Sequence, residues 1–114
     1  MSSPAEFPLE VTCQTVQAKL QANHPFLLLD CREASEHQLV NIAPAMLLPM
    51  SEIQQRLAEL EPYRDQEIIV HCHHGGRSMR VTQFLRQQGF RQVSNMAGGI
   101  DQWAVEIDTS LARY

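Results

Sequence analysis

Residues 68–78 read Ile-Ile-Val-His-Cys-His-His-Gly-Gly-Arg-Ser and contain the change from strand to helix on which the fold prediction depends. The β-branched run Ile68-Ile69-Val70 is typical of a strand that is buried on both faces. Gly75-Gly76 end this pattern, and apolar residues at helical spacing follow from Met79 until Gly89. The segment therefore predicts a buried strand, a tight turn and a helix in direct succession.

The same alternation of strand and helix patterns extends over most of the chain. Short apolar runs predict further strands at residues 8–11, 26–29, 45–48 and 92–96. Helices are expected after an N-cap at Thr12, over residues 33–39, after an N-cap at Ser51 with Pro62 just past the helix end, and after Gly98-Gly99. This order predicts the α/β class, with a central parallel sheet of about five strands and helices on both faces.

The chain has the length and composition of one globular domain. It contains 114 residues, of which 44% are hydrophobic and 19% are charged, as in folded rather than disordered chains. We expect a short polar lead-in at residues 1–8, one domain at residues 9–108 and a C-terminal tail at residues 109–114. The net charge of −4 gives no reason to expect a nucleic-acid partner.

The cysteines Cys13, Cys31 and Cys72 indicate the cellular compartment. An odd number in a chain that is not cysteine-rich favours free thiols, which are typical of reducing compartments, over a disulfide framework. Residues 1–10 lack the basic and apolar regions of a signal peptide, and no apolar run approaches the ~18 residues of a membrane span. We therefore expect a cytoplasmic protein without a membrane partner.

The turn that contains Cys72 has the features of an anion-binding loop. It joins a buried strand to the N-terminus of a helix, where free N–H groups and the positive end of the helix dipole lie. Gly75-Gly76 let successive amides point inward, and Arg77 adds a fixed positive charge. A cysteine at the mouth of such a loop is expected to have a lowered pKa and to react as a thiolate. The alternative is that Cys72 is a small buried apolar side chain.

His73 and His74 follow the cysteine directly. In a cupped loop they are expected to line the mouth and to bind anions when protonated, and the alternative is that both are solvent-facing polar residues. With His71 and Cys72 they form four consecutive potential metal ligands, but adjacent residues rarely converge on one ion. We therefore expect no metal site.

Two motifs in the first half of the chain resemble those of the rhodanese family. Asp30, Arg32 and Glu36 are spaced as in the family's D-x-R-x-x-x-E segment. Residues 42–49 are similar to its G-H-I-P-G-A…I-P segment. The Gly-His opening of that segment is missing here, and Ala45 replaces its glycine after proline.

Two further motifs complete the resemblance, which covers about residues 8–108. Residues 72–78 resemble the family's active loop, C-x-x-G-x-R-S, and residues 98–103 resemble its closing G-G-x-x-x-W. The four motifs occur in the family's order on a matching α/β pattern. The chain is therefore identified as a single-domain member of the rhodanese family.

The resemblance implies a role for each matching residue. Cys72 would accept a sulfane sulfur, hold it as a persulfide and pass it to a nucleophile, and this chemistry needs no cofactor. Gly75-Gly76 and Arg77 would cradle that sulfur. Asp30 and Arg32 match a polar pair expected to brace the active-site end of the sheet, with structural hydrogen bonding alone as the alternative.

Cys31 stands where the rhodanese family often has an aliphatic residue. It is interpreted as a small buried side chain. The alternative is a thiol that resolves an oxidised or persulfidated Cys72.

Loop length separates two kinds of chemistry. Cys72 and Arg77 are spaced C-x-x-x-x-R, whereas related cysteine phosphatases have one more residue in the loop. The shorter ring of amides suits one sulfur atom better than a tetrahedral phosphate, and no general acid for a phosphatase is evident.

We therefore predict a sulfurtransferase of the thiosulfate:cyanide type. It would move sulfur from a small sulfur anion such as thiosulfate, or from a persulfide donor, to cyanide, a thiol or a protein. The alternatives are a non-catalytic rhodanese-like binding or regulatory module and, less favoured, a cysteine phosphatase-like enzyme.

Overall fold

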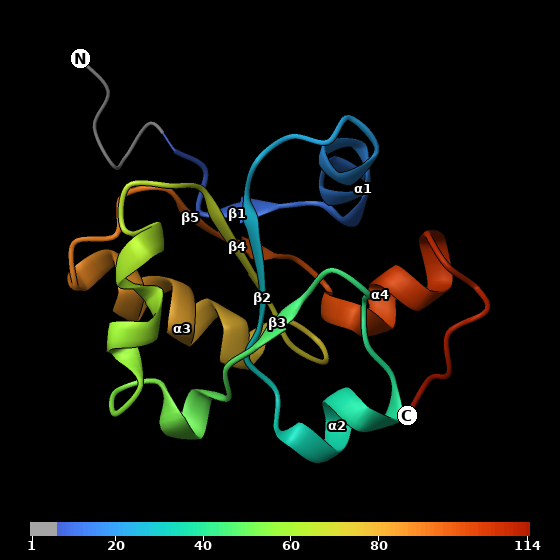
Figure 1. Ribbon diagram of the computed structural model, residues 1–114. Coiled ribbons are helices and arrows are strands. Elements are labelled where there is room, and N and C mark those ends of the chain that lie inside the picture. The colour runs from blue at the N-terminus through green and yellow to red at the C-terminus, as the bar shows by residue number, and fades with distance from the viewer. Residues whose placement is uncertain (1–6) are drawn as a thin grey trace.

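The computed structural model describes residues 7–114, within which five parallel strands form one sheet. The strands are β1 (Glu10–Val11), β2 (Leu27–Asp30), β3 (Met46–Leu47), β4 (Ile68–His71) and β5 (Val93–Met96), in the spatial order β1-β5-β4-β2-β3. The α-helices of the same range are α1 (Cys13–Gln21), α2 (Ala34–Leu39), α3 (Gly76–Gln87) and α4 (Gly99–Glu106). The predicted α/β class with a parallel sheet is confirmed (Figure 1).

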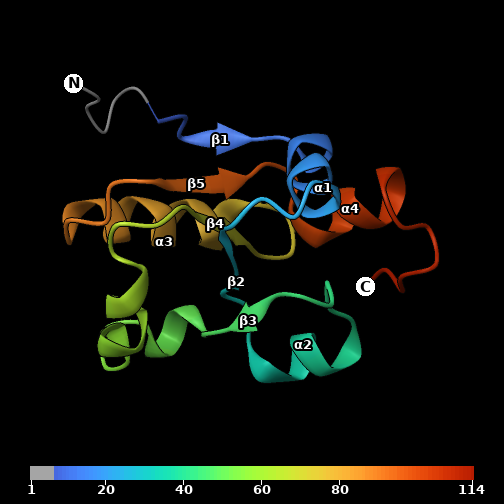
Figure 2. The same ribbon diagram turned by 45° about the horizontal axis from the view of Figure 1, so that its top comes forward.

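Helices cover both faces of the sheet, as the sequence predicted. Figure 1 shows α1 and α4 on one side of the sheet, and α3 with the green 3-10 segments on the other. Helix α1 begins at the expected N-cap, because the Thr12 hydroxyl accepts a hydrogen bond of 3.1 Å from the N–H of Thr15. The turned view in Figure 2 places α2 beyond the ends of β2 and β3, away from both covering layers.

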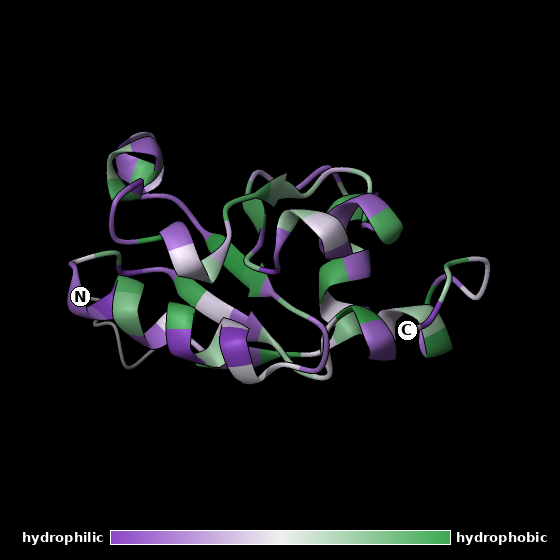
Figure 3. Ribbon diagram, turned by 90° about the horizontal axis from the view of Figure 1, so that it is seen from below, coloured by the Kyte–Doolittle hydropathy of each residue, from purple (hydrophilic) through white to green (hydrophobic). Residues whose placement is uncertain are grey.

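Side chains of each central strand alternate between two apolar clusters. Leu27, Leu29, Ile68 and Val70 pack toward α3 and the 3-10 segments, whereas Leu28 and Ile69 pack toward α1 and α4. Because both faces are covered, all residues of β2, β4 and β5 are buried. This burial explains the continuous apolar runs in the sequence. Figure 3 shows hydrophobic green in the centre of the sheet and in bands on the helices that cover it.

The strand order brings the loops after β2 and β4 together. These two strands are neighbours, with Leu27 paired to Ile68 and Asp30 to His71. Since all pairs are parallel, the carboxyl ends of the strands lie at one edge of the sheet, which is where ligands bind in such folds. The Cys72 loop and the segment that follows Asp30 therefore lie side by side.

The prediction of a regular helix that begins after an N-cap at Ser51 is wrong. The segment forms two 3-10 helices, η2 (Met50–Glu52) and η3 (Leu57–Tyr63), with Pro62 inside the second rather than past its end. Proline lacks the N–H that a regular α-helix would need at that point. The hydroxyl of Ser51 donates to the carboxylate of Glu33, at 2.9 Å, instead of capping a helix.

The expected apolar face of this segment nevertheless exists. Ile53 and Leu60 are buried in the cluster beside α3.

Within the described residues, no helix has the length and apolar character needed to cross a membrane. Residues 1–6 of the expected lead-in lie outside the described range.

Candidate active site

The Cys72 loop connects β4 to α3 and is held in place by the start of α4. Gly75 has φ of 111° as the N-cap of α3, a conformation that favours glycine. The N–H of Ile100 donates to the carbonyl of Cys72 at 2.9 Å, and that of Asp101 to the carbonyl of His73 at 3.1 Å. A Cβ on Gly99 would lie 2.4 Å from the His73 carbonyl oxygen. The Gly98-Gly99 turn therefore supports the backbone of the Cys72 loop.

The sulfur of Cys72 is surrounded by hydrogen-bond donors. Gly75 N lies 3.1 Å from Sγ, Ser78 N lies 3.4 Å away, and the hydroxyl of Ser78 lies 3.2 Å away. Burial alone would raise the pKa of Cys72, but the hydrogen bonds from Ser78 and from the loop amides outweigh it and lower the pKa. Donors placed in this way favour the thiolate over the thiol, and the reaction of Cys72 as a thiolate stays a prediction.

Ser78 is itself held by the neighbouring strand. Its hydroxyl is hydrogen-bonded to the carboxamide oxygen of Asn95 on β5. The amide group of Asn95 donates to Glu10 at 3.0 Å and to the carbonyl of Gly75 at 3.3 Å. Sequence reasoning included Ser78 only as part of the loop motif and gave no role to Asn95, because nothing local links β5 to the loop.

Arg77 lies beside the loop and is paired with a carboxylate. Its guanidinium donates two hydrogen bonds to Glu36 of α2, at 2.7 and 2.9 Å. Arg77 lowers the pKa of Glu36 to about 2, and Glu36 in turn raises the pKa of Arg77. The positive charge near Cys72 is thus fixed in position by Glu36, the last acidic residue of the D-x-R-x-x-x-E motif.

The structure brings Asp30 and Arg32 together as a buried ion pair at the end of β2. The Nε and Nη2 atoms of Arg32 lie 2.9 and 2.8 Å from the two carboxylate oxygens of Asp30, and both side chains are fully buried. Burial opposes the charge on Asp30, but the hydrogen bonds from Arg32 and the nearby His71 and His37 lower its pKa. Arg32 also donates to the carbonyl of Val40 at 2.7 Å. The pair thereby ties β2 to the end of α2.

His73 and His74 occupy different environments at the rim of the loop. The ring of His73 is stacked on that of Tyr114, with centroids 3.8 Å apart and an interplanar angle of 6°. Burial, followed by the charge of His74, lowers the pKa of His73. The side chain of His74 is exposed, and its Nδ1 lies 3.9 Å from Asp101. The predicted anion binding by both imidazoles stays a prediction, and the contact with Tyr114 had no signal in the sequence.

Cys31 and Cys72 directly follow the paired ends of β2 and β4, where Asp30 is paired with His71. The N–H of Cys31 donates to the carbonyl of His71 at 3.1 Å, which continues the pairing of β2 with β4 by one residue. Both cysteines belong to the apolar cluster beside α3, and all three cysteines of the chain are free. Burial, and then the charge of Cys72, raise the pKa of Cys31. Cys13 lies in the other apolar cluster, and burial raises its pKa to about 11.

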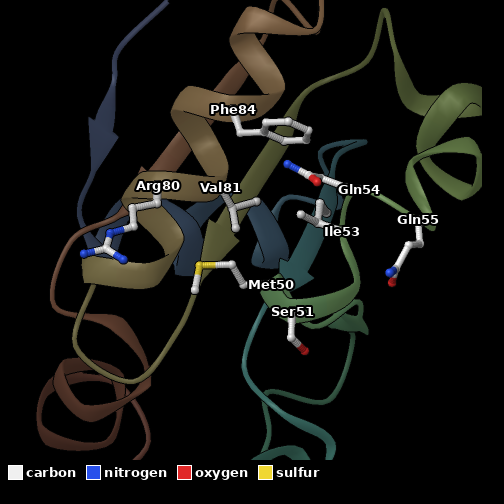
Figure 4. A pocket seen from close by; sticks show the side chains of 8 residues that line it. All are labelled: Met50, Ser51, Ile53, Gln54, Gln55, Arg80, Val81 and Phe84. Atoms are coloured by element: carbon white, nitrogen blue, oxygen red, sulfur yellow. The ribbon is translucent and has the colours of Figure 1, made fainter.

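A small groove opens beside the loop, between η2 and α3 (Figure 4). Its volume is about 290 Å³. Met50 and Phe84 form its partly buried apolar walls, and Arg80 supplies a charged rim. Over the described range, no three histidine, cysteine or acidic side chains converge in a way that could hold a metal ion.

Comparison with known proteins identifies the family of this chain. The family model of the rhodanese-like domain matches residues 12–106. A protein of Allochromatium vinosum named sulfurtransferase is 33% identical over 95 residues, which are 83% of this chain and 87% of that protein. The crystal structure of a rhodanese-related protein from Thermoplasma volcanium matches with a TM-score of 0.76 and 31% identity, covering 86% of this chain and 92% of that one.

Other relatives are much longer proteins. A maize protein named adenylyltransferase and sulfurtransferase MOCS3-2 is 29% identical over 109 residues and matches 91% of this chain, but the chain spans only 23% of its length. The family match covers residues 12–106, which is most of the chain, and agrees with the fold. The chain belongs to the rhodanese-like domain family.

Proposed function

We propose that the protein is a sulfurtransferase that carries a sulfane sulfur as a persulfide on Cys72. One observation carries the proposal: the Cys72 sulfur accepts hydrogen bonds from Gly75 N, Ser78 N and the Ser78 hydroxyl within 3.4 Å. Donors arranged in this way stabilise a thiolate before the reaction. The names of relatives such as the Allochromatium vinosum sulfurtransferase support the same class of reaction.

In the first step, the Cys72 thiolate attacks the outer sulfur of thiosulfate or of another sulfane donor. A sulfur–sulfur bond forms to Cys72 while the bond between the outer and inner sulfur of thiosulfate breaks. Sulfite leaves with the electron pair of that bond. Because sulfite is a weak base, its departure needs no general acid.

In the second step, a nucleophile such as cyanide, a thiol or a protein thiol attacks the outer sulfur of the Cys72 persulfide. The sulfur–sulfur bond breaks, and its electron pair returns to Cys72 as the thiolate. The loop amides face this sulfur and would hold negative charge on the persulfide. The Arg77–Glu36 pair places a positive charge next to the entering anion. Free, buried thiols suit a reducing compartment such as the cytoplasm.

The reaction is tested by mass spectrometry and by turnover. Incubation with thiosulfate is expected to add one sulfur atom to Cys72, and cyanide is expected to remove it as thiocyanate. Cys72→Ser should abolish both events, whereas Cys13→Ser, on the other face of the sheet, should retain them.

Three outcomes would contradict the proposal. Full thiosulfate:cyanide turnover by Cys72→Ser would exclude the persulfide on this residue. Absence of an adduct with thiosulfate and with an organic persulfide would favour a non-catalytic binding module. Hydrolysis of an aryl phosphate by the wild-type protein, lost in Cys72→Ser, would instead favour the phosphatase-like alternative.

A further inference from the structure

The last residues of the sequence return to the Cys72 loop. Arg113 of this segment forms an ion pair with Asp101 on α4, with Nε and Nη2 lying 2.9 and 3.2 Å from the carboxylate oxygens. Leu111 packs against the apolar cluster beneath α4. Figure 1 shows the end of the chain beside α2, although α4 immediately precedes this segment. Residues 111–114 therefore bridge α4 and α2 across the rim of the loop.

The ring of Tyr114 contacts the loop directly. It stacks on His73, with centroids 3.8 Å apart and an interplanar angle of 6°. His73 immediately follows Cys72, and its other ring neighbour is His74, at a centroid distance of 3.8 Å. The Tyr114 ring thus limits the orientations of a side chain one residue from the reactive sulfur.

The hydroxyl of Tyr114 joins the two ion pairs of the site. It accepts a hydrogen bond of 2.9 Å from Nη1 of Arg32 and donates one of 2.8 Å to Oε2 of Glu36. Arg32 is paired with Asp30, and Glu36 is paired with Arg77. The result is a continuous network of hydrogen bonds and ion pairs from the end of β2 to the guanidinium of Arg77 beside Cys72. The Tyr114 hydroxyl therefore acts in this network both as a hydrogen-bond donor and as an acceptor.

We propose that Tyr114 is a positioning residue of the active site, and that residues 111–114 form one wall of the entrance to Cys72. Its ring holds His73 in place, and its hydroxyl holds Glu36 and, through Glu36, Arg77. The kinetic part of this proposal rests on the proposed sulfur transfer. The steric part depends only on access to the Cys72 sulfur.

The steric part is tested by alkylation. Cys72 is the expected target, because the pKa values of Cys13 and Cys31 are raised by burial. We expect Tyr114→Ala to speed the reaction of Cys72 with a bulky maleimide by about threefold or more, with a smaller change for iodoacetamide. Tyr114→Phe retains the stacked ring and should react at the wild-type rate. Peptide mass spectrometry identifies the modified cysteine.

The kinetic part is tested with thiosulfate as the donor. We expect Tyr114→Phe to raise KM about threefold and to leave kcat within about twofold, since the hydroxyl positions an anion-binding charge rather than the reacting sulfur. The matched control is Tyr63→Phe, which removes the hydroxyl of the tyrosine that ends η3 and packs against the apolar cluster beside α3. Arg113→Ala releases the segment from Asp101 without changing Tyr114, and should accelerate maleimide alkylation as Tyr114→Ala does.

The outcomes separate this proposal from the proposed function. If the wild-type protein transfers no sulfur, the alkylation rates still decide whether residues 111–114 wall the entrance. If Tyr114→Ala and Arg113→Ala both alkylate at the wild-type rate, the wall does not exist. If Tyr114→Phe matches Tyr63→Phe in KM, the hydroxyl has no positioning role. Should Tyr114→Ala fail to fold, the Tyr114→Phe and Arg113→Ala variants still decide both parts.

Discussion

The hydroxyl of Ser78 lies 3.2 Å from the sulfur of Cys72 and is also hydrogen-bonded to the carboxamide oxygen of Asn95. A hydroxyl has one proton, so it donates to only one of these acceptors at a time. When Cys72 is a thiol, it can donate to Ser78 while Ser78 donates to Asn95. When Cys72 is a thiolate, the Ser78 proton can turn to the sulfur. Ser78 can therefore adapt to both protonation states of the reactive residue.

Ser78→Ala is expected to raise the pKa of Cys72. Because the thiolate is the reactive form, the rate of alkylation by iodoacetamide rises as the pH passes through this pKa. Loss of a hydrogen bond to a charged group should move the midpoint of that rise upward by about one pH unit.

The matched control for Ser78→Ala is Thr82→Val. Thr82 lies one turn further along α3, and its buried hydroxyl has no hydrogen-bond partner among the described residues. Thr82→Val should therefore titrate as the wild-type protein does. An unchanged midpoint in Ser78→Ala would show that the loop amides alone lower the pKa of Cys72.

Glu36→Gln is expected to weaken the fold in a pH-dependent way. Arg77 lowers the pKa of Glu36 to about 2 in the folded chain. A carboxyl with a lowered pKa contributes its full stability above its unfolded pKa, about 4.3, and this contribution is lost as the pH falls toward the folded pKa. Glu36→Gln should therefore lower the free energy of unfolding by about 1 kcal/mol at neutral pH, and by less at pH 3.

Urea unfolding at pH 7 and pH 3 measures this difference. The control is Glu61→Gln, since Glu61 forms an exposed ion pair with Arg64. An exposed pair contributes little to stability, so this control should resemble the wild-type protein at both pH values. Equal losses for Glu36→Gln at the two pH values would show that the Arg77 pair does not lower the pKa of Glu36.

His71→Leu is expected to make the fold less sensitive to mild acid. His71 is completely buried, and burial lowers its pKa to about 4 against the opposing charge of Asp30, while Arg32 and His37 lower it further. Between about pH 6.5 and pH 4 the unfolded chain binds a proton at this residue that the folded chain does not, so stability falls as the pH falls. His71→Leu removes this loss of stability in mild acid.

Unfolding free energies measured at pH 7 and pH 5 test this prediction, with His74→Gln at an exposed position as the control. If His71→Leu loses as much stability between pH 7 and pH 5 as the wild-type protein does, the pKa of His71 is not lowered in the folded protein.

The sequence predicted the parts of the site that depend on local pattern. The apolar run Ile68–Val70 and Gly75-Gly76 placed a strand, a turn and a helix around Cys72, and the structure has all three. Asp30 and Arg32 lie two residues apart at the end of β2, and the resemblance to the rhodanese family marked them as a polar pair before the structure showed their ion pair. These features are set within short stretches of chain, where spacing is informative.

The remaining features depend on contacts between distant segments. Tyr114 reaches Glu36 and His73 from the far end of the sequence, and no periodicity indicates such a contact. The expected helix after Ser51 failed for a related reason, because Glu33 binds the Ser51 hydroxyl and Pro62 disfavours a regular helix. The sequence predicted Arg77 only as a fixed positive charge of the loop, and the position of α2 in the structure shows that Glu36 is the residue that pairs with it.

Cys31→Ala is expected to leave the lifetime of the Cys72 persulfide unchanged. A resolving Cys31 would attack the Cys72 sulfur, form a disulfide between the two residues and release the outer sulfur as hydrosulfide. That attack requires a thiolate, whereas burial and the nearby charge of Cys72 raise the pKa of Cys31 and keep it protonated. Cys31 is therefore expected to act as a buried apolar neighbour, although it lies next to Cys72 on the same face of the sheet.

The persulfide is loaded with thiosulfate, freed of donor and followed by mass spectrometry together with hydrogen sulfide release. Cys13→Ala is the matched control, because Cys13 is equally buried but lies in the opposite apolar cluster. Both variants remove one buried sulfur and should lose about 1 kcal/mol of stability, so a general loosening would affect them alike. A persulfide that survives longer in Cys31→Ala than in Cys13→Ala, with less hydrogen sulfide released, would show that Cys31 resolves Cys72 despite its burial.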